Sequence, residues 1–442
     1  MSDLAHFDVS RRTLLKGGLL ALATGPLLAA CGVNTSGSGG AGSVNFLSTQ
    51  FSPVEERQKY EATLKKFAGD IKVAYNPVDT GIFNTTLKSQ LAAGKVEVGI
   101  AGGLHGDLVP FASQLEDLSS LMKDLSSAGY SDDLKELSKL GTDVPRYIPW
   151  IQATYVLAIN KKALEWLPSG ADVNKLTYDQ YLAWAQAAKA ANGRPVFGIP
   201  AGPKGLHHRF YQGFLLPSFT GGQITTFRNP DAVTAWTYMR ELWANMNPAS
   251  ANYDFMQEPL GNGEVLVAWD HVARLITAVK DKPDEWLMVP APSGPKGKGY
   301  LLIVGGMAVP QGSPEKDKAF ELIKALSKPE AQIETLKSNS FFPVVKTDVG
   351  GDLPGGVALE AKAVKAQQEA SDALLALPPV GLGEKDPQVS QLFKNCFQEI
   401  CLNNADVKAT LDRQGAELAK IMDSLNVPCW APDPKQTPCK VA

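Results

Sequence analysis

Strand-like and helix-like segments alternate between residues 44 and 101. Short apolar runs of strand length are separated by longer stretches in which apolar residues recur at helical spacing. An alternating strand–helix order is typical of a parallel sheet flanked by helices. The sequence therefore predicts an α/β fold whose first strands lie at 44–47, 71–75 and 96–101 and whose first helices lie at 54–67 and 84–93.

The loops that follow these strands are the first candidate sites. Ligands of parallel α/β sheets bind beyond the carboxyl ends of the strands. Four side chains on these loops are predicted as polar or stacking contacts: Gln50, Phe51, Asp79 and His105.

The first thirty-one residues have the order of an export signal. Arg11 and Arg12 precede an uncharged run over 17–30, which is shorter than the roughly 20 apolar residues that span a bilayer. The basic segment resembles a twin-arginine signal, and LAAC at 28–31 resembles a lipobox whose cysteine is lipidated. We therefore expect a signal peptide over 1–30, then lipidated Cys31 and a flexible linker over 31–43. The alternative is a buried amphipathic N-terminal helix.

Composition limits the class of partner. The chain has 442 residues, of which 44% are hydrophobic and 20% charged, as in ordinary globular proteins of two domains or one large α/β body. A net charge of −3 argues against a nucleic-acid partner. Beyond the N-terminal run, no stretch is long and apolar enough to predict a membrane span.

Four cysteines remain if Cys31 carries lipid. They allow three pairings, and an exported chain would meet conditions in which disulfides persist. Cys396 and Cys401 are predicted to point to different faces of one helix, so the proline-rich tail is expected to be stapled to itself or to that helix. Metal binding is the alternative, but the spacings match no zinc pattern. The candidate disulfide residues are Cys396, Cys401, Cys429 and Cys439.

Several segments, in order, resemble one known family. The chain is similar to the extracellular solute-binding proteins of ABC importers, in particular the maltose-type carbohydrate-binding group, family 1. It departs from that group at Val96-Glu97, where Pro-Asp is common, and at Ser340-Phe341, where a glycine usually precedes the proline. The matching segments are YIPW at 147–150 with AINK at 158–161, TYDQ at 177–180, GEVLVAW at 263–269, PAPSGP at 290–295 with GGMAVP at 305–310, and FFPVVK at 341–346.

The resemblance implies a two-lobe periplasmic-binding-protein fold of type II, each lobe a sheet flanked by helices, joined by a hinge of several crossings. The expected lobes are 44–153 plus 302–328 and 154–301 plus 329–442. The ligand, a carbohydrate, would lie in the cleft between lobes that close on it. The resemblance further implies delivery to the transmembrane subunits of an ABC permease, beside which a lipid anchor would keep the protein. No cofactor, metal or catalytic residue is predicted, and a monomer is expected.

Sugar sites combine flat aromatic surfaces with hydrogen-bonding groups. Trp150 and Tyr155 flank a predicted hinge crossing, and Trp269 and Asp270 end a predicted strand. We expect the tryptophans to stack on sugar rings, Asp270 to accept two hydroxyls, and Arg274 to orient Asp270 or reach an acidic ligand. The alternatives are hinge packing for Trp150, core packing for Trp269 and a helix N-cap for Asp270.

The remaining candidates lie on loops or crossings. His207, His208 and Tyr211 follow a Gly/Pro loop, where hydrogen bonding to ligand or a solvated helix start is favoured over metal binding. Gly306 would let backbone amides approach a ligand. Phe342 would line the cleft or pack the third crossing.

Two other functions remain open from the sequence. A lipid-anchored glycoside hydrolase is the rival from another class, although no GxSxG, HExxH or P-loop motif is present. A transporter role with a glycerophosphodiester or a peptide as ligand is the second. A phosphate ligand would need convergent basic groups or a helix N-terminus in the cleft. Lys204, His207 and Arg274 are candidates for such groups.

Overall fold

The computed structural model describes residues 42–349, 352–379, 381–382 and 385–442. The predicted signal peptide, Cys31 and nearly all of the predicted linker lie outside these residues. The predicted boundaries of those segments therefore stay predictions.

The first sheet has five strands in the order β2 (Val73–Pro77), β1 (Val44–Ser48), β3 (Ile100–Leu104), β10 (Ile303–Ala308) and β4 (Ile148–Ala153). β1 pairs in parallel with β2 and β3, whereas β10 runs antiparallel to β3 and β4. Helices α1 (Val54–Phe67) and α2 (Thr80–Ala93) provide the two crossovers. The predicted strand–helix alternation is confirmed.

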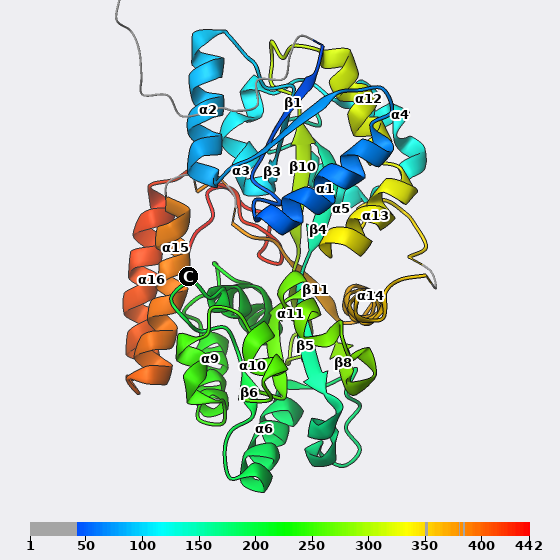
Figure 1. The fold of residues 1–442 in the computed structure, drawn as a ribbon. Coiled ribbons are helices and arrows are strands. Elements are labelled where there is room, and N and C mark those ends of the chain that lie inside the picture. The colour runs from blue at the N-terminus through cyan, green and yellow to red at the C-terminus, as the bar shows by residue number, and fades with distance from the viewer. Residues whose placement is uncertain (1–41, 350–351, 380, 383–384) are drawn as a thin grey trace, which may run out of the picture. The chain divides into compact units, whose positions relative to one another are not determined.

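A second sheet has four strands in the order β6 (Phe197–Gly198), β7 (Val267–His271), β5 (Tyr155–Asn160) and β8 (Trp286–Val289). A separate parallel pair joins β9 (Lys298–Leu301) to β11 (Ala373–Ala376). The chain passes from β4 of the first sheet to β5 of the second, which lies below it in Figure 1, and Thr154 lies between the two strands. It returns to the first sheet between β9 and β10, at Leu302. The Thr154 hydroxyl donates to the Leu301 carbonyl (2.6 Å), so the two crossings are tied together. Two sheets joined by several crossings are the predicted two-lobe α/β fold.

Helices cover both sheets. Thr177 and Gln180, in the TYDQ segment, form a capping box at the start of α6. The remaining α-helices are α3 (His105–Leu108), α4 (Ser119–Asp124), α5 (Asp132–Ser138), α6 (Tyr178–Asn192), α7 (His207–Phe210), α8 (Leu216–Thr220), α9 (Pro230–Trp243), α10 (Gln257–Gly261), α11 (Val272–Val279), α12 (Lys316–Leu326), α13 (Pro329–Asn339), α14 (Gly355–Gln368), α15 (Asp386–Phe397) and α16 (Val407–Asp423). Shorter turns of 3₁₀ or π type are η1 (Val109–Gln114), η2 (Ser126–Ala128), η3 (Lys161–Trp166), η4 (Tyr211–Leu215), η5 (Pro248–Asn252), η6 (Pro283–Glu285) and η8 (Gln398–Leu402).

Helix α13 lies on the first lobe, whereas the predicted boundary at 328/329 gives it to the second. It packs against α1, and the Asn339 side-chain amide donates to the Glu56 carbonyl (3.0 Å). The next crossing therefore follows α13, where Phe342 and Gln152 exchange backbone hydrogen bonds of 2.7 and 3.1 Å.

Of the four cysteines in the described part of the chain, two form a disulfide and two are free thiols. Cys429 and Cys439 form a disulfide, which closes the proline-rich tail on itself as one of the two predicted arrangements. Cys396 and Cys401 are free, the first buried and the second partly exposed.

Candidate functional site

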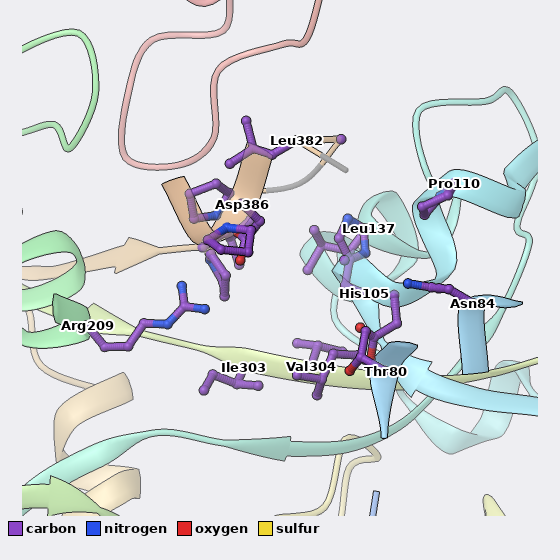
Figure 2. Close-up of a pocket in the computed structure, with 18 of the residues that line it drawn as sticks. Thr80, Asn84, His105, Pro110, Leu137, Arg209, Ile303, Val304, Leu382 and Asp386 are labelled. Carbon is purple, nitrogen blue, oxygen red and sulfur yellow. The ribbon is translucent and has the colours of Figure 1, made fainter. Parts of the chain in front are cut away.

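A cavity of about 540 Å³ lies between elements of the first lobe and segments of the second. Figure 2 shows Arg209 on one side of this cavity and Thr80, Asn84 and His105 on the other, with Ile303 and Val304 of β10 along one wall. The lining residues are Thr80, Gly81, Asn84, Leu104, His105, Gly106, Asp107, Pro110, Leu137, Arg209, Leu302, Ile303, Val304, Leu377, Pro378, Pro379, Gly381, Leu382, Asp386 and Pro387.

Asp107 organises the first-lobe wall at the carboxyl end of β3. Its Oδ2 accepts the Thr49 hydroxyl (2.8 Å) and the Leu104 amide (3.0 Å), and Thr49 Oγ1 accepts the Gln50 side-chain amide (2.9 Å). Burial raises the pKa of Asp107, while these hydrogen bonds act in the opposite direction. The predicted residue Gln50 thus supports a lining carboxylate.

His105 lines the cavity next to Asp107, as the position after β3 predicts. Its Nδ1 lies 3.0 Å from the Tyr147 hydroxyl. Burial lowers the pKa of His105 to about 4, so the imidazole is neutral at pH 7 and offers one donor and one acceptor. Asp79, also predicted, caps α2 by accepting the Ile82 amide (2.9 Å), which fixes the adjacent lining residue Thr80.

The second-lobe side contributes one guanidinium and one carboxylate. Arg209, from α7, donates to Gln212 Oε1 (3.1 Å). Asp386 begins α15, and burial raises its pKa, with the positive charge of Arg209 opposing that shift. The cavity therefore presents charged groups of both signs.

Much of the remaining lining is aliphatic. Leucine, isoleucine, valine and proline contribute eleven of its residues, and among the described lining residues the imidazole of His105 is the one aromatic ring. Apolar C–H surface can pack against the faces of a ligand, while Thr80, Asn84, His105 and the charged groups can hydrogen-bond its rim.

The structure places the predicted first-lobe aromatics in the core. Trp150 is 1% exposed and contacts Phe46, Phe51 and Tyr60 at ring-centroid distances of 5.3–5.6 Å. Gly306 is also buried, and it packs so closely against the Tyr147 ring that a Cβ at this position would lie 2.1 Å from it. Phe342, 5% exposed, packs at the third crossing.

The predicted second-lobe pair of tyrosine and tryptophan is likewise buried. Tyr155 and Trp269 stack with centroids 4.6 Å apart. Asp270 is fully buried, accepts the amides of Met256 (2.9 Å) and His271 (2.7 Å), and lies 3.7 Å from Arg274. Burial raises the pKa of Asp270 to about 6. The helix N-cap of α11 is His271 rather than Asp270.

His207, His208 and Tyr211 lie under the surface beside Arg209. His207 Nδ1 is 3.1 Å from the Tyr211 hydroxyl, and both rings contact Phe397. Burial lowers the pKa of His207 to about 3. No three His, Cys, Asp or Glu side chains of the described residues converge as a metal site would require.

Five polar lining residues were not predicted from the sequence: Thr80, Asn84, Asp107, Arg209 and Asp386. Asp107 carried a usable signal, since it lies on the loop after β3 that also supplied His105. Arg209 lies between His208 and Tyr211, two of the predicted site residues. Asp386 had no local signal, because only the tertiary fold brings it to this site.

Comparisons with known proteins agree with the fold. A sequence model of bacterial extracellular solute-binding proteins matches residues 52–333. No curated protein matches the chain in sequence. The structure is similar to maltose-bound MalE3 of T. maritima, with a TM-score of 0.68 and 20% identity over 85% of this chain and 99% of that one.

Two further solved structures share this fold. The GacH receptor of Streptomyces glaucescens, solved unliganded and with acarbose, gives a TM-score of 0.67 at 18% identity, covering 87% of this chain and 99% of that chain. UgpB from Mycobacterium tuberculosis, in complex with glycerophosphocholine, also gives a TM-score of 0.67 at 18% identity, covering 87% of this chain and 99% of that chain. Because the sequence model spans well over half of the chain, the protein belongs to the bacterial extracellular solute-binding protein family.

Proposed function

We propose that this protein captures a carbohydrate in the cavity between its lobes and delivers it to an ABC permease for import. The observation that carries the proposal is the cavity of about 540 Å³, whose polar groups come from both lobes. A ligand that contacts Arg209 and His105 together would bridge the two lobes, and so would favour an arrangement that keeps both side chains within its reach.

The lining suits a sugar bound without turnover. Aliphatic and proline side chains offer surface for C–H faces, and Thr80, Asn84 and Asp386 offer donors and acceptors for hydroxyls. A glycosidase would need one free acid and a second carboxylate beside the scissile bond. Asp107, one of the two lining carboxylates, is already held by Thr49 and the Leu104 amide.

Export and anchoring complete the proposal. The N-terminal pattern supports export with lipidation at Cys31, and we propose that the mature protein acts as a monomer tethered to the membrane. None of the helices in the described part of the chain has the length and apolar character that crossing a bilayer requires.

A glycerophosphodiester is the second candidate ligand. Arg209 faces the cavity and is not within ion-pair distance of a carboxylate among the described residues, so it can receive a phosphate. The similar fold of UgpB, solved with glycerophosphocholine, is compatible with this ligand class.

A thermal-shift panel tests the proposal. It should contain mono- and oligosaccharides, including maltose, together with glycerophosphocholine and short peptides. We expect at least one sugar to raise the melting temperature, since a ligand at 100 times its Kd stabilises the folded state by about 2.7 kcal/mol. Stabilisation by glycerophosphocholine alone would favour the second candidate. Sugar products accumulating on prolonged incubation would favour the hydrolase, and no response to any sugar would contradict the proposal.

A further inference from the structure

One wall of the cavity is built by the segment that follows β11. Leu377, Pro378, Pro379, Gly381 and Leu382 all line it. The two prolines donate no backbone hydrogen bonds, so this segment depends on other elements to hold its position. Those elements include the C-terminal tail, residues 427–442.

Direct contacts join this wall to the tail. The Leu377 amide donates to the Ala431 carbonyl (2.9 Å). Gly381, at φ +76°, lies against Val427, because a Cβ there would be 3.0 Å from Val427 Cγ1. The wall segment is therefore in contact with the tail at both of its ends.

Gln223 bridges the wall and the tail. It is fully buried, and its Nε2 donates to the Leu377 carbonyl (2.9 Å) and to the Ala431 carbonyl (2.8 Å). A buried amide that satisfies two carbonyls at once fixes their spacing, since moving either one leaves a buried polar group unpaired.

Asp433 fastens the tail to the loop that carries Gln223. Its carboxylate accepts the amides of Gln223 (3.1 Å), Ile224 (3.0 Å) and Thr225 (2.9 Å), and also the Thr225 hydroxyl. Asp433 is 5% exposed, so these charge-assisted bonds are largely shielded from water.

The disulfide holds the tail in the shape that these contacts need. The Cys429–Cys439 bridge closes a loop in which the Cys429 amide donates to the Gln436 carbonyl (2.9 Å). The Cys439 amide donates to the carbonyl of Val427, which lies just before this loop (2.8 Å). Both bridging cysteines lie close to residues that touch the wall: Cys429 is two residues from Ala431, and Val427 accepts from Cys439.

We propose that the disulfide-closed tail is a positioning element of the solute cavity, which sets the wall at 377–379 and 381–382 through Gln223, Ala431 and Val427. This inference rests on the proposed function, because it assumes that the cavity bounded by this wall is where the solute binds. The coupling between tail and wall is a property of the ligand-free protein. Opening the disulfide should loosen the wall while the strands of both lobes stay folded.

Hydrogen–deuterium exchange of the ligand-free protein tests the coupling. The wild type is compared before and after treatment with a phosphine reductant, and with the double variant Cys429→Ser/Cys439→Ser. We expect the Leu377 amide to exchange about tenfold faster or more once the bridge is open, while amides of β1 and β5 change little. The double variant should exchange like the reduced wild type and should not respond to reductant.

Two controls separate positioning from general stability. Gln332, like Gln223, is a buried glutamine whose Nε2 donates to two backbone carbonyls, those of Trp150 and Leu326 (both 2.9 Å), but it lies away from the tail. Gln223→Leu should accelerate exchange at Leu377, and Gln332→Leu should not do so selectively. Cys401→Ser controls for the free thiols.

Unchanged exchange at Leu377 after reduction would overturn the proposal. Equal acceleration in β1 and β5 would also overturn it, because the tail would then be a general stabiliser. Since no solute is present, a failure here is distinct from a failure of the sugar panel.

Discussion

Replacing Trp269 with alanine is expected to lower the free energy of unfolding by about 3–5 kcal/mol. The indole is 1% exposed, stacks on Tyr155 and meets the edges of Phe210 and Phe214 at 5.1 and 5.3 Å. Truncation would leave a cavity where three elements of the second lobe meet. Urea denaturation should show a lower midpoint with an unchanged slope.

Trp243 provides the matched control. It is partly buried and meets one ring, that of Phe397 at 4.8 Å, so Trp243→Ala should cost clearly less. If Trp269→Ala instead unfolded at the wild-type urea concentration and lost solute binding, Trp269 would act as the stacking platform that its position at the end of a predicted strand suggested.

Acidification from pH 7 to pH 5 is the second change with a large expected effect. Burial lowers the pKa of His105 to about 4, that of His207 and His271 to about 3, and that of His208 well below its usual range. Histidines of the unfolded chain bind protons below about pH 6.5. Between pH 7 and pH 5 the unfolded state therefore binds more protons than the folded state, and the free energy of unfolding decreases as the pH is lowered. Each such histidine should cost roughly 2 kcal/mol by pH 5.

Buried acids oppose this trend, most strongly Asp270 and Glu360, and more weakly Asp107 and Asp386, whose pKa values burial also raises. The pKa of Asp270 is raised to about 6 and that of Glu360 is raised well above its ordinary value, both by burial, so the folded state binds protons there on acidification. The net loss of stability should therefore be clearly smaller than the sum of the four histidine contributions.

Urea midpoints at the two pH values measure the net effect. His271→Asn is the informative variant, because His271 caps α11 through its Nδ1 and asparagine is a good N-cap that does not titrate. It should remove roughly 2 kcal/mol of the pH dependence. If His271→Asn kept the full pH dependence of the wild type, His271 would not be held neutral in the folded protein.

The sequence predicted the alternating framework well because apolar periodicity reports burial directly. β1 and α1 fall almost where the pattern put them, but β3 begins at Ile100 rather than 96. Residues 96–99 were predicted as part of the strand because they belong to an apolar run. In the structure the backbone amides of Glu97 and Val98 donate to the side-chain oxygen of Gln90 rather than to a neighbouring strand. Helix α2 begins four residues early because Asp79 caps it.

The site was harder to predict, for a physical reason. His105 could be placed because strand ends in α/β sheets converge at one edge. Arg209 and Asp386 lie 177 residues apart in the sequence, and only the packing of α7 against α15 brings them to the cavity. Aromatic residues such as Trp150 and Tyr155 suit both sugar stacking and a core, and the sequence pattern does not separate the two.

The most direct test of the solute cavity fills it with a side chain. Gly106 lines the cavity, its φ is not positive, and a Cβ there would meet only the Pro379 carbonyl oxygen, at 4.0 Å. A phenylalanine at this position can therefore enter the cavity without backbone strain. Gly261, whose Cβ would meet nothing within 4 Å, is the surface control.

Calorimetric titration should use the sugar that stabilises the wild type most strongly in the panel. We expect Gly106→Phe to lose detectable binding while it keeps the wild-type urea midpoint, and Gly261→Phe to bind like the wild type. Binding by Gly106→Phe with wild-type affinity would contradict the placement of the solute in this cavity.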